Sequence, residues 1–238
     1  MAQSKILEID VVSDNVCPWC FVGKRKLEKA IAQVRESDPE VQVEVRWHPY
    51  QLNPHQEGSV DKRSYYHSKF GKDSFEMMEA RLRKVGENEG ITFTQDGTLG
   101  NTLDSHRLVY FAQNKGKQDE AVEAIFKSYF EQGKNLADPS ILIGIAEDIG
   151  LNKDEFQKYL LSGEGDDEVR SEVQKHRKYV NGVPHFTINQ KYSLSGAQDP
   201  SEFLTAFRRA IPNIGKSSES APQSKGSAQA CSDGACAL

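Results

Sequence analysis

Hydrophobic positions follow two different spacings in the first fifty residues. Residues 6–12 form a short apolar run rich in β-branched side chains, and the polar residues after it predict a buried strand that ends in a turn. From Pro18 to residue 37, apolar side chains recur every three or four positions, which predicts an amphipathic helix. Apolar and polar residues then alternate over 41–48, as in a strand with one buried face. The chain is therefore expected to open with a β-α-β unit.

Helical spacing dominates the next hundred residues, and no strand is predicted there. Helices are expected near residues 65–83, 102–113, 122–130, 139–149 and 155–161. Strand character returns in a hairpin with strands at 184–188 and 192–195, and a last helix is expected at 200–210. A long helical segment therefore separates the opening unit from a closing hairpin.

Length and composition favour a globular protein, because the 238 residues are 37% hydrophobic and 27% charged. Thirty Lys and Arg against 35 Asp and Glu give a net charge of −5, which offers nucleic acid no general attraction. No apolar run approaches the roughly 18 residues of a membrane-spanning helix, and the N-terminal sequence does not resemble a secretory signal. We therefore expect a cytoplasmic protein that binds neither nucleic acid nor membranes.

The first of two close cysteine pairs is Cys17-Pro18-Trp19-Cys20, between a predicted strand and a predicted helix. In this context a C-x-x-C spacing indicates a thioredoxin-like redox centre. Pro18 suits the first helical position, and Cys17 then caps the helix, where free N–H groups and the helix dipole favour a thiolate. We therefore expect Cys17 to be the attacking sulfur and Cys20, one turn later, to be the resolving thiol.

Half of a zinc site and a pair of inert core cysteines are the alternatives for this motif. A closed zinc site needs four ligands, and the other cysteine pair lies in residues 213–238, a stretch rich in Ser, Ala and Gly. Two inert cysteines fit poorly with Pro18 and Trp19 between them at a helix start. No metal is therefore expected.

Five motifs follow one another along the chain and reinforce this interpretation. They are VCPWCFVGKR at 16–25, WHPYQLNP at 47–54, NTLDSHRL at 101–108, GVPHF at 182–186 and SGAQ at 195–198. In this order they resemble the FrnE-type DsbA-like thiol-disulfide oxidoreductases, over about residues 6 to 210. The resemblance implies an α/β thioredoxin-like fold interrupted by an all-helical insertion. It also implies a protein disulfide oxidoreductase or isomerase.

The resemblance also implies how the chain is divided. A discontinuous thioredoxin-like domain would comprise residues 1–54 and 169–212, with a helical insertion at 55–168. Residues 213–238 lie beyond the resemblance, and their Ser, Ala and Gly content predicts a flexible tail with a C-x4-C pair.

Several further site residues are implied by the resemblance. The Val183–Pro184 bond would be cis and face the cysteines, although most X-Pro bonds are trans. Because Pro184 lacks an N–H, the Val183 backbone would be free to pair with an extended substrate. His106 would lie near the cysteines and either influence the thiolate or satisfy a helix-packing hydrogen bond. His48 and His185 are expected to have surface or packing roles.

Two other functions stay open at this point. The resemblance extends to the kappa-class glutathione transferases and the 2-hydroxychromene-2-carboxylate isomerases, which typically carry serine where this chain has Cys17. A glutathione-dependent enzyme for a small molecule and a non-catalytic holdase are therefore the alternatives. No cofactor is implied, substrate proteins with thiols or disulfides are the expected partners, and glutathione or the thioredoxin system are candidate redox partners. The oligomeric state is left open.

Cys231 and Cys236 form the second pair, and the Asp-Gly sequence between them favours a turn that would bring the sulfurs together. As a flexible chain, residues 213–238 would span about 25–30 Å, enough to approach Cys17 and Cys20. The pair is therefore either incidental or an auxiliary dithiol that exchanges with the first pair.

Overall fold

A four-stranded mixed sheet forms the centre of the protein in the computed structural model, which describes residues 5–212 and 214. The strand order is β2-β1-β5-β6. β1 (Ile6–Ser13) is parallel to β2 (Gln42–Pro49), whereas β5 (His185–Ile188) is antiparallel to both β1 and β6 (Tyr192–Ser195). The predicted β-α-β unit and hairpin are therefore confirmed, and they share one sheet.

β1 lies inside this sheet, between β2 and β5, which explains its apolar sequence. Leu7, Ile9 and Val11 alternate along the strand and are fully buried. Cα register pairs Val11 with Trp47 of β2 on one side and with Phe186 of β5 on the other. The strand therefore holds both halves of the sheet together, and its C-terminal end leads directly to the first cysteine pair.

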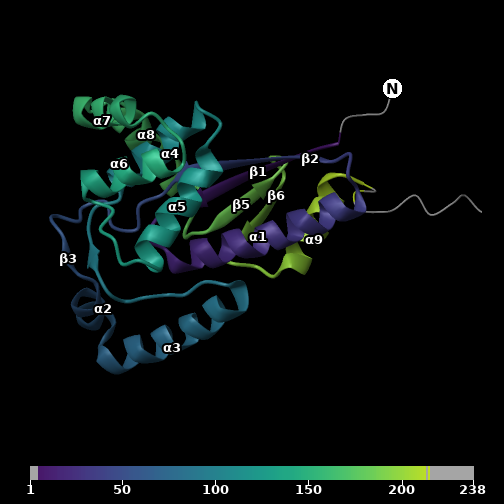
Figure 1. Cartoon of the computed structure of the whole chain (residues 1–238). Coiled ribbons are helices and arrows are strands. Elements are labelled where there is room, and N and C mark those ends of the chain that lie inside the picture. The colour runs from purple at the N-terminus through teal and green to yellow at the C-terminus, as the bar shows by residue number, and fades with distance from the viewer. Residues whose placement is uncertain (1–4, 213, 215–238) are drawn as a thin grey trace, which may run out of the picture.

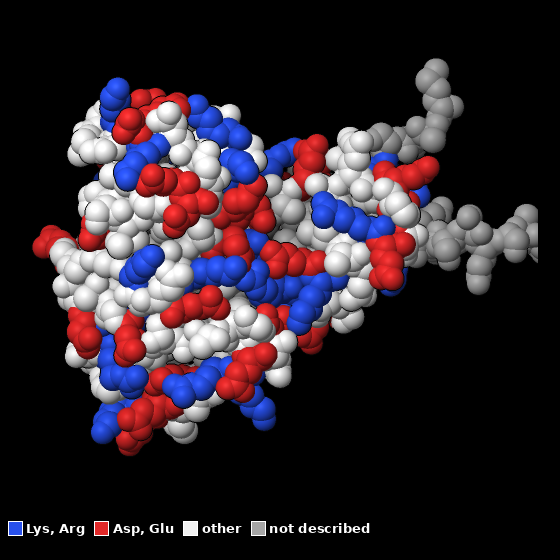
Figure 2. Space-filling model, viewed as in Figure 1, with Lys and Arg blue, Asp and Glu red and all other residues white. Residues whose placement is uncertain are grey.

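Helices cover this sheet (Figure 1). α1 (Pro18–Ser37) and α9 (Pro200–Ala210) lie side by side along it, and α8 (Asp166–Arg177) packs against β2. The polar side of α1 forms ion pairs with α5 (Gln118–Phe130), as between Arg25 and Glu123. Figure 2 shows positive and negative side chains interleaved on the visible face of the molecule.

The remaining elements lie between β2 and α8 in the chain. They are β3 (Val60–Asp61), α2 (Lys62–Phe70), α3 (Lys72–Glu89), β4 (Thr98–Leu99), α4 (Leu103–Gln113), α5 (Gln118–Phe130), α6 (Pro139–Asp148) and α7 (Lys153–Ser162). The helices predicted near 102–113, 122–130, 139–149 and 155–161 are confirmed, with small shifts at their ends. The proposed boundaries of the helical insertion stay a prediction.

Three local predictions differ from the structure. The helix expected at 65–83 is two helices, because Gly71 adopts a φ of +81° between α2 and α3. β3 and β4 form a short antiparallel pair in a region where no strand was expected. α8 was not predicted, because its charged sequence buries only Val169 and Val173 and therefore lacks a clear apolar period.

No helix among the described residues is long and apolar enough to cross a lipid bilayer.

Candidate active site

Cys17 occupies the N-cap of α1. Its backbone is extended, with φ −90° and ψ 112°, and Pro18 follows at the start of the helix. The Cys17 amide donates to the Asp14 carbonyl at 3.0 Å, so a tight turn joins β1 to the helix. The predicted position of Cys17 at the helix N-cap is therefore confirmed, and the first helical amides are directed toward this end of α1.

Cys20 lies one turn further along α1 and is more deeply buried than Cys17. Cys20 is fully buried, whereas 5% of Cys17 is exposed, and both are free thiols. Burial and the neighbouring Cys17 thiol raise the pKa of Cys20 well above its usual value, although the Ser13 hydroxyl and the Asp14 amide oppose the rise. Cys20 therefore holds its proton as long as the neighbouring Cys17 is not bonded to another sulfur.

The Val183–Pro184 peptide bond is cis, as the resemblance implied. Val183 lies beside the first cysteine, since the Cys17 thiol donates to its carbonyl with an Sγ to O distance of 3.6 Å. Gly23 on α1 permits Pro184 to approach the helix, because a Cβ at Gly23 would lie 3.0 Å from the Pro184 Cγ atom. The structure therefore brings Cys17, Val183 and Pro184 together.

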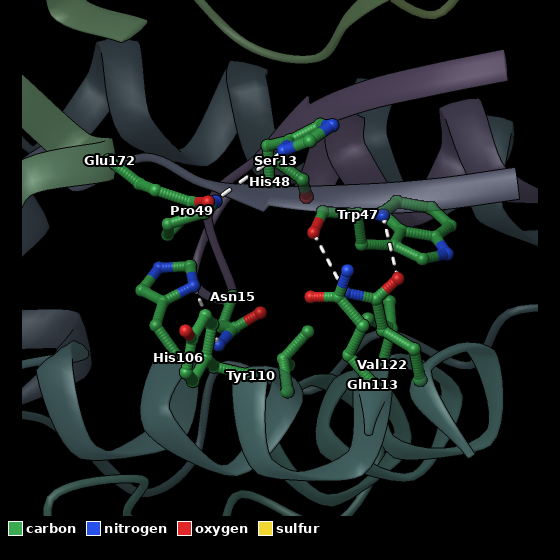
Figure 3. Close-up of a pocket in the computed structure, with 12 residues that line it drawn as sticks. Ser13, Asn15, Trp47, His48, Pro49, His106, Tyr110, Gln113, Val122 and Glu172 are labelled. Carbon is green, nitrogen blue, oxygen red and sulfur yellow. Dashed lines mark hydrogen bonds and ion pairs between the residues drawn. The ribbon is translucent and has the colours of Figure 1, made fainter. Parts of the chain in front are cut away.

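His106, on α4, contacts the turn that precedes the cysteines. Its Nε2 lies 3.3 Å from the Asp14 carboxylate. Its Nδ1 lies 3.4 Å from the side-chain amide nitrogen of Asn15, and Figure 3 shows these two side chains next to each other. Asn15 also donates to the Ser105 hydroxyl at 2.8 Å. His106 therefore supports the turn, because its ring nitrogens contact Asp14 and Asn15 and neither cysteine sulfur.

Asp14 is a site residue that sequence reasoning missed. Its side chain is fully buried and accepts a hydrogen bond from the Leu52 amide at 2.7 Å in addition to its contact with His106. In the sequence, Asp14 is only one of several polar residues after a strand. Its burial depends on the loop after β2 and on α4, which no local pattern reveals.

A cavity of about 500 Å³ opens beside Cys17, between the start of α1 and the α2–α3 pair. Large apolar side chains that line it remain partly exposed, namely Trp19, Leu52, Phe70 and Met78. The cavity is therefore large enough and apolar enough to receive a side chain or a small molecule next to the attacking sulfur.

Lys62 is a buried cation in the wall of this cavity and was also missed. Its Nζ donates to the Tyr129 carbonyl at 3.1 Å and lies 3.9 Å from the centre of the Tyr129 ring. Burial lowers the pKa of Lys62 to about 8, although Asp96 opposes this shift. In the sequence, Lys62 resembles any lysine at a helix start, so only the fold reveals its position.

The other predicted residues lie elsewhere. His48 of β2 contacts Asp10 at 2.9 Å, and His185 of β5 contacts the Ser195 hydroxyl at 3.1 Å. Neither lines the cavity beside Cys17. Cys231 and Cys236 lie outside the described residues.

The sheet, the cysteine pair at a helix start and the proline beside it define the class of thioredoxin-like thiol proteins. A model of the DSBA-like thioredoxin domain family matches residues 8–208. The chain belongs to this family.

Solved structures share this fold. A probable DsbA oxidoreductase, SCO1869 from Streptomyces coelicolor, is 27% identical, with a TM-score of 0.78 over 98% of this chain and 99% of its own. A 2-hydroxychromene-2-carboxylate isomerase is 13% identical, with a TM-score of 0.64 over 85% of this chain and 95% of its own. The cytosolic disulfide reductase DsbM from Pseudomonas aeruginosa, solved with GSH, is 15% identical, with a TM-score of 0.57 over 85% and 96%.

Proposed function

We propose that this protein is a thiol-disulfide oxidoreductase that exchanges disulfides with protein substrates through Cys17 and Cys20. The observation that carries the proposal is the difference between the two thiols. Cys17 borders the cavity at the start of α1, whereas Cys20 is fully buried behind it. Membership of the DSBA-like thioredoxin domain family supports the same chemistry.

In the reducing direction, the Cys17 thiolate attacks one sulfur of a substrate disulfide. The substrate S–S bond breaks, and the departing sulfur takes up a proton as a thiol. Cys20 then loses its proton and attacks the Cys17 sulfur of the mixed disulfide, which releases the second substrate thiol and leaves a Cys17–Cys20 disulfide. The reverse sequence oxidises a substrate dithiol.

The environment of Cys20 orders these steps. The charge of Cys17 contributes to the high pKa of Cys20. When Cys17 is joined to the substrate, that charge is gone, so deprotonation of Cys20 becomes easier. Cys20 is therefore activated at the stage at which it has to resolve the mixed disulfide.

Substrate proteins would bind as extended chains beside Val183 and place an apolar side chain in the cavity. Main-chain pairing of this kind does not depend on the substrate sequence, so the enzyme would accept many proteins. We place the reaction in the cytoplasm, with glutathione or the thioredoxin system as its redox partner. The GSH in the DsbM structure supports glutathione.

A glutathione-dependent transferase or isomerase is the second candidate. The cavity of about 500 Å³ and its buried cation, Lys62, favour it, because both would suit a small anionic ligand. The cysteine at position 17 favours disulfide exchange instead, since the related transferases and isomerases typically use serine there. A holdase has the exposed apolar rim of the cavity in its favour.

Cys17→Ser and Cys20→Ser variants distinguish these functions. We expect Cys17→Ser to abolish insulin reduction and reduced-ribonuclease oxidation, and Cys20→Ser to accumulate mixed disulfides with substrates. Retained disulfide exchange in Cys17→Ser would overturn the proposal. Retained glutathione-dependent turnover of a small molecule would support the second candidate, and aggregation suppression without any thiol chemistry in the wild type would support the holdase.

A further inference from the structure

Two histidines and a glutamate meet at the junction of β2 and α8. His48 lies near the end of β2, whereas Glu172 and His176 are four residues apart on α8 and so project from one side of that helix. One potential ligand atom of each residue lies within 4.8 Å of the other two. The Nδ1 of His48 is 4.0 Å from the Glu172 carboxylate (Figure 3).

The hydrogen bonds around this cluster leave ring nitrogens free. Asp10 accepts from the Nε2 of His48 at 2.9 Å, so the neutral form of this ring carries its lone pair on Nδ1, the nitrogen 4.0 Å from the Glu172 carboxylate. A carboxylate behind a histidine in this way is the usual support of a metal-binding imidazole. The Nε2 of His176 is buried and has no hydrogen-bond partner among the described residues.

We propose that His48, Glu172 and His176 form a binding site for a divalent transition-metal ion such as Zn²⁺. Two imidazoles and one carboxylate suit such ions, whereas Mg²⁺ and Ca²⁺ prefer oxygen ligands alone. Tetrahedral zinc with bonds of about 2.0–2.1 Å needs ligand atoms about 3.3 Å apart. Small side-chain rotations would bring the three ligand atoms from their present separations to this geometry.

Solvent reaches two of the three proposed ligands. The side chains of His48 and Glu172 are 23% and 38% exposed, which leaves solvent access for exchange and for a water ligand.

The metal would tie β2 to the helix that precedes the active-site loop. α8 ends at Arg177, whose guanidinium donates to the Gln51 carbonyl at 2.8 Å, and Val183 follows six residues later. The site itself is separate from the cavity beside Cys17, since none of its three ligands lines that cavity. We therefore expect the metal to stabilise the fold without taking part in disulfide exchange.

Calorimetric titration of Zn²⁺ into the chelator-treated, fully oxidised full-length protein tests this proposal. Oxidation matters because free thiols also bind zinc, and a thiol assay verifies that none remains. We expect the titration to give one Zn²⁺ per chain. In thermal denaturation, a free Zn²⁺ concentration of 100 times the Kd should raise the Tm by about 5–10 °C. Equal concentrations of Mg²⁺ should leave the Tm unchanged, and an equal stabilisation by Mg²⁺ would contradict the assigned class of ion.

Variants identify the ligands. His48→Gln/His176→Gln should lower the affinity at least 100-fold, whereas His55→Gln, at an exposed histidine outside the cluster, should match the wild type. If the double variant does not fold, Glu172→Gln, at a partly exposed position of α8, should still lower the affinity at least 10-fold. Asp10→Asn should weaken binding about 10–100-fold through loss of support for His48. Absence of stoichiometric binding by the wild type, or wild-type affinity in Glu172→Gln and the double variant, overturns the site.

Discussion

The Nε2 atom of His106 lies 3.3 Å from the Oδ1 atom of Asp14, three residues before Cys17. Asn15 approaches the other ring nitrogen through its amide NH₂ group, which can only donate. A neutral ring with its proton on Nε2 satisfies both neighbours, because it accepts from Asn15 and donates to Asp14. His106 thus fixes the buried Asp14 carboxylate in the turn that precedes Cys17 and Cys20.

His106→Ala should therefore destabilise the protein and disturb the cysteines. Loss of the ring leaves Asp14 short of a partner, which costs about 1–3 kcal/mol in the free energy of unfolding. His106→Gln, which keeps a donor, should recover part of this loss. Urea denaturation measures the stability, and alkylation of Cys17 measures the effect on the site. Wild-type stability in His106→Ala would contradict the supporting role.

Gly23→Ala should separate Pro184 from α1. The added methyl group would lie 3.0 Å from both the Pro184 Cγ and the Phe186 ring, so we expect a loss of about 1–3 kcal/mol and slower disulfide exchange. Gly144→Ala in α6 is the matched control, because a Cβ there has no neighbour within 4 Å. The control should gain roughly 0.5–1 kcal/mol from its higher helix propensity. Equal stability of the two variants would show that the approach of Pro184 needs no glycine.

The stability contributed by Glu123 should disappear in acid. Burial alone would raise its pKa, but the pairing with Arg25 and Lys24 prevails and lowers the pKa from 4.5 to about 2. A carboxylate with a depressed pKa stabilises the fold above its unfolded pKa and loses this effect as the pH falls toward the folded value. Wild type should therefore exceed Glu123→Gln by about 1–2 kcal/mol at pH 7, after allowance for solvent screening, and the difference should vanish between pH 4.5 and 2. Urea denaturation across this range measures it, and a constant difference would contradict the ion-pair origin.

Lys62→Met should distinguish charged from neutral thiol reagents. The change removes a buried cation from the cavity, so glutathione, which carries carboxylates, should reduce the Cys17–Cys20 disulfide at least several-fold more slowly. The rate with uncharged 2-mercaptoethanol should stay close to that of wild type. Lys69→Met, at an exposed position of the same cavity, should have a smaller effect because solvent screens its charge. An equal loss with both reagents would indicate a packing effect instead.

The parts of the site that could be predicted from the sequence are those encoded by local spacing. Cys17 and Cys20 are three residues apart at a strand-to-helix junction, and apolar periodicity alone locates that junction. The strands of the closing hairpin are likewise visible in their alternation. The cis state of the Val183–Pro184 bond came from family resemblance, since proline by itself does not specify it.

The remaining features depend on contacts between distant segments. Asp14 receives its partners from the loop after β2 and from α4, and Lys62 is buried against Tyr129 of α5. The cluster of His48, Glu172 and His176 forms only because α8 packs on β2, and the charged sequence of α8 gives no clear apolar period from which to predict that helix. Sequence patterns report the burial of a side chain within its own element, and they do not report which element will cover it.

Complete burial of Cys20 also bears on how the protein withstands oxidants. Hydrogen peroxide approaching through the cavity meets the sulfur of Cys17 first, because Cys20 has no exposed surface. The sulfenic acid formed on Cys17 would have a thiol beside it, and their condensation to a disulfide releases water before a second peroxide can produce the irreversible sulfinic acid. The same placement that makes Cys20 the second thiol to react therefore protects the first from permanent damage.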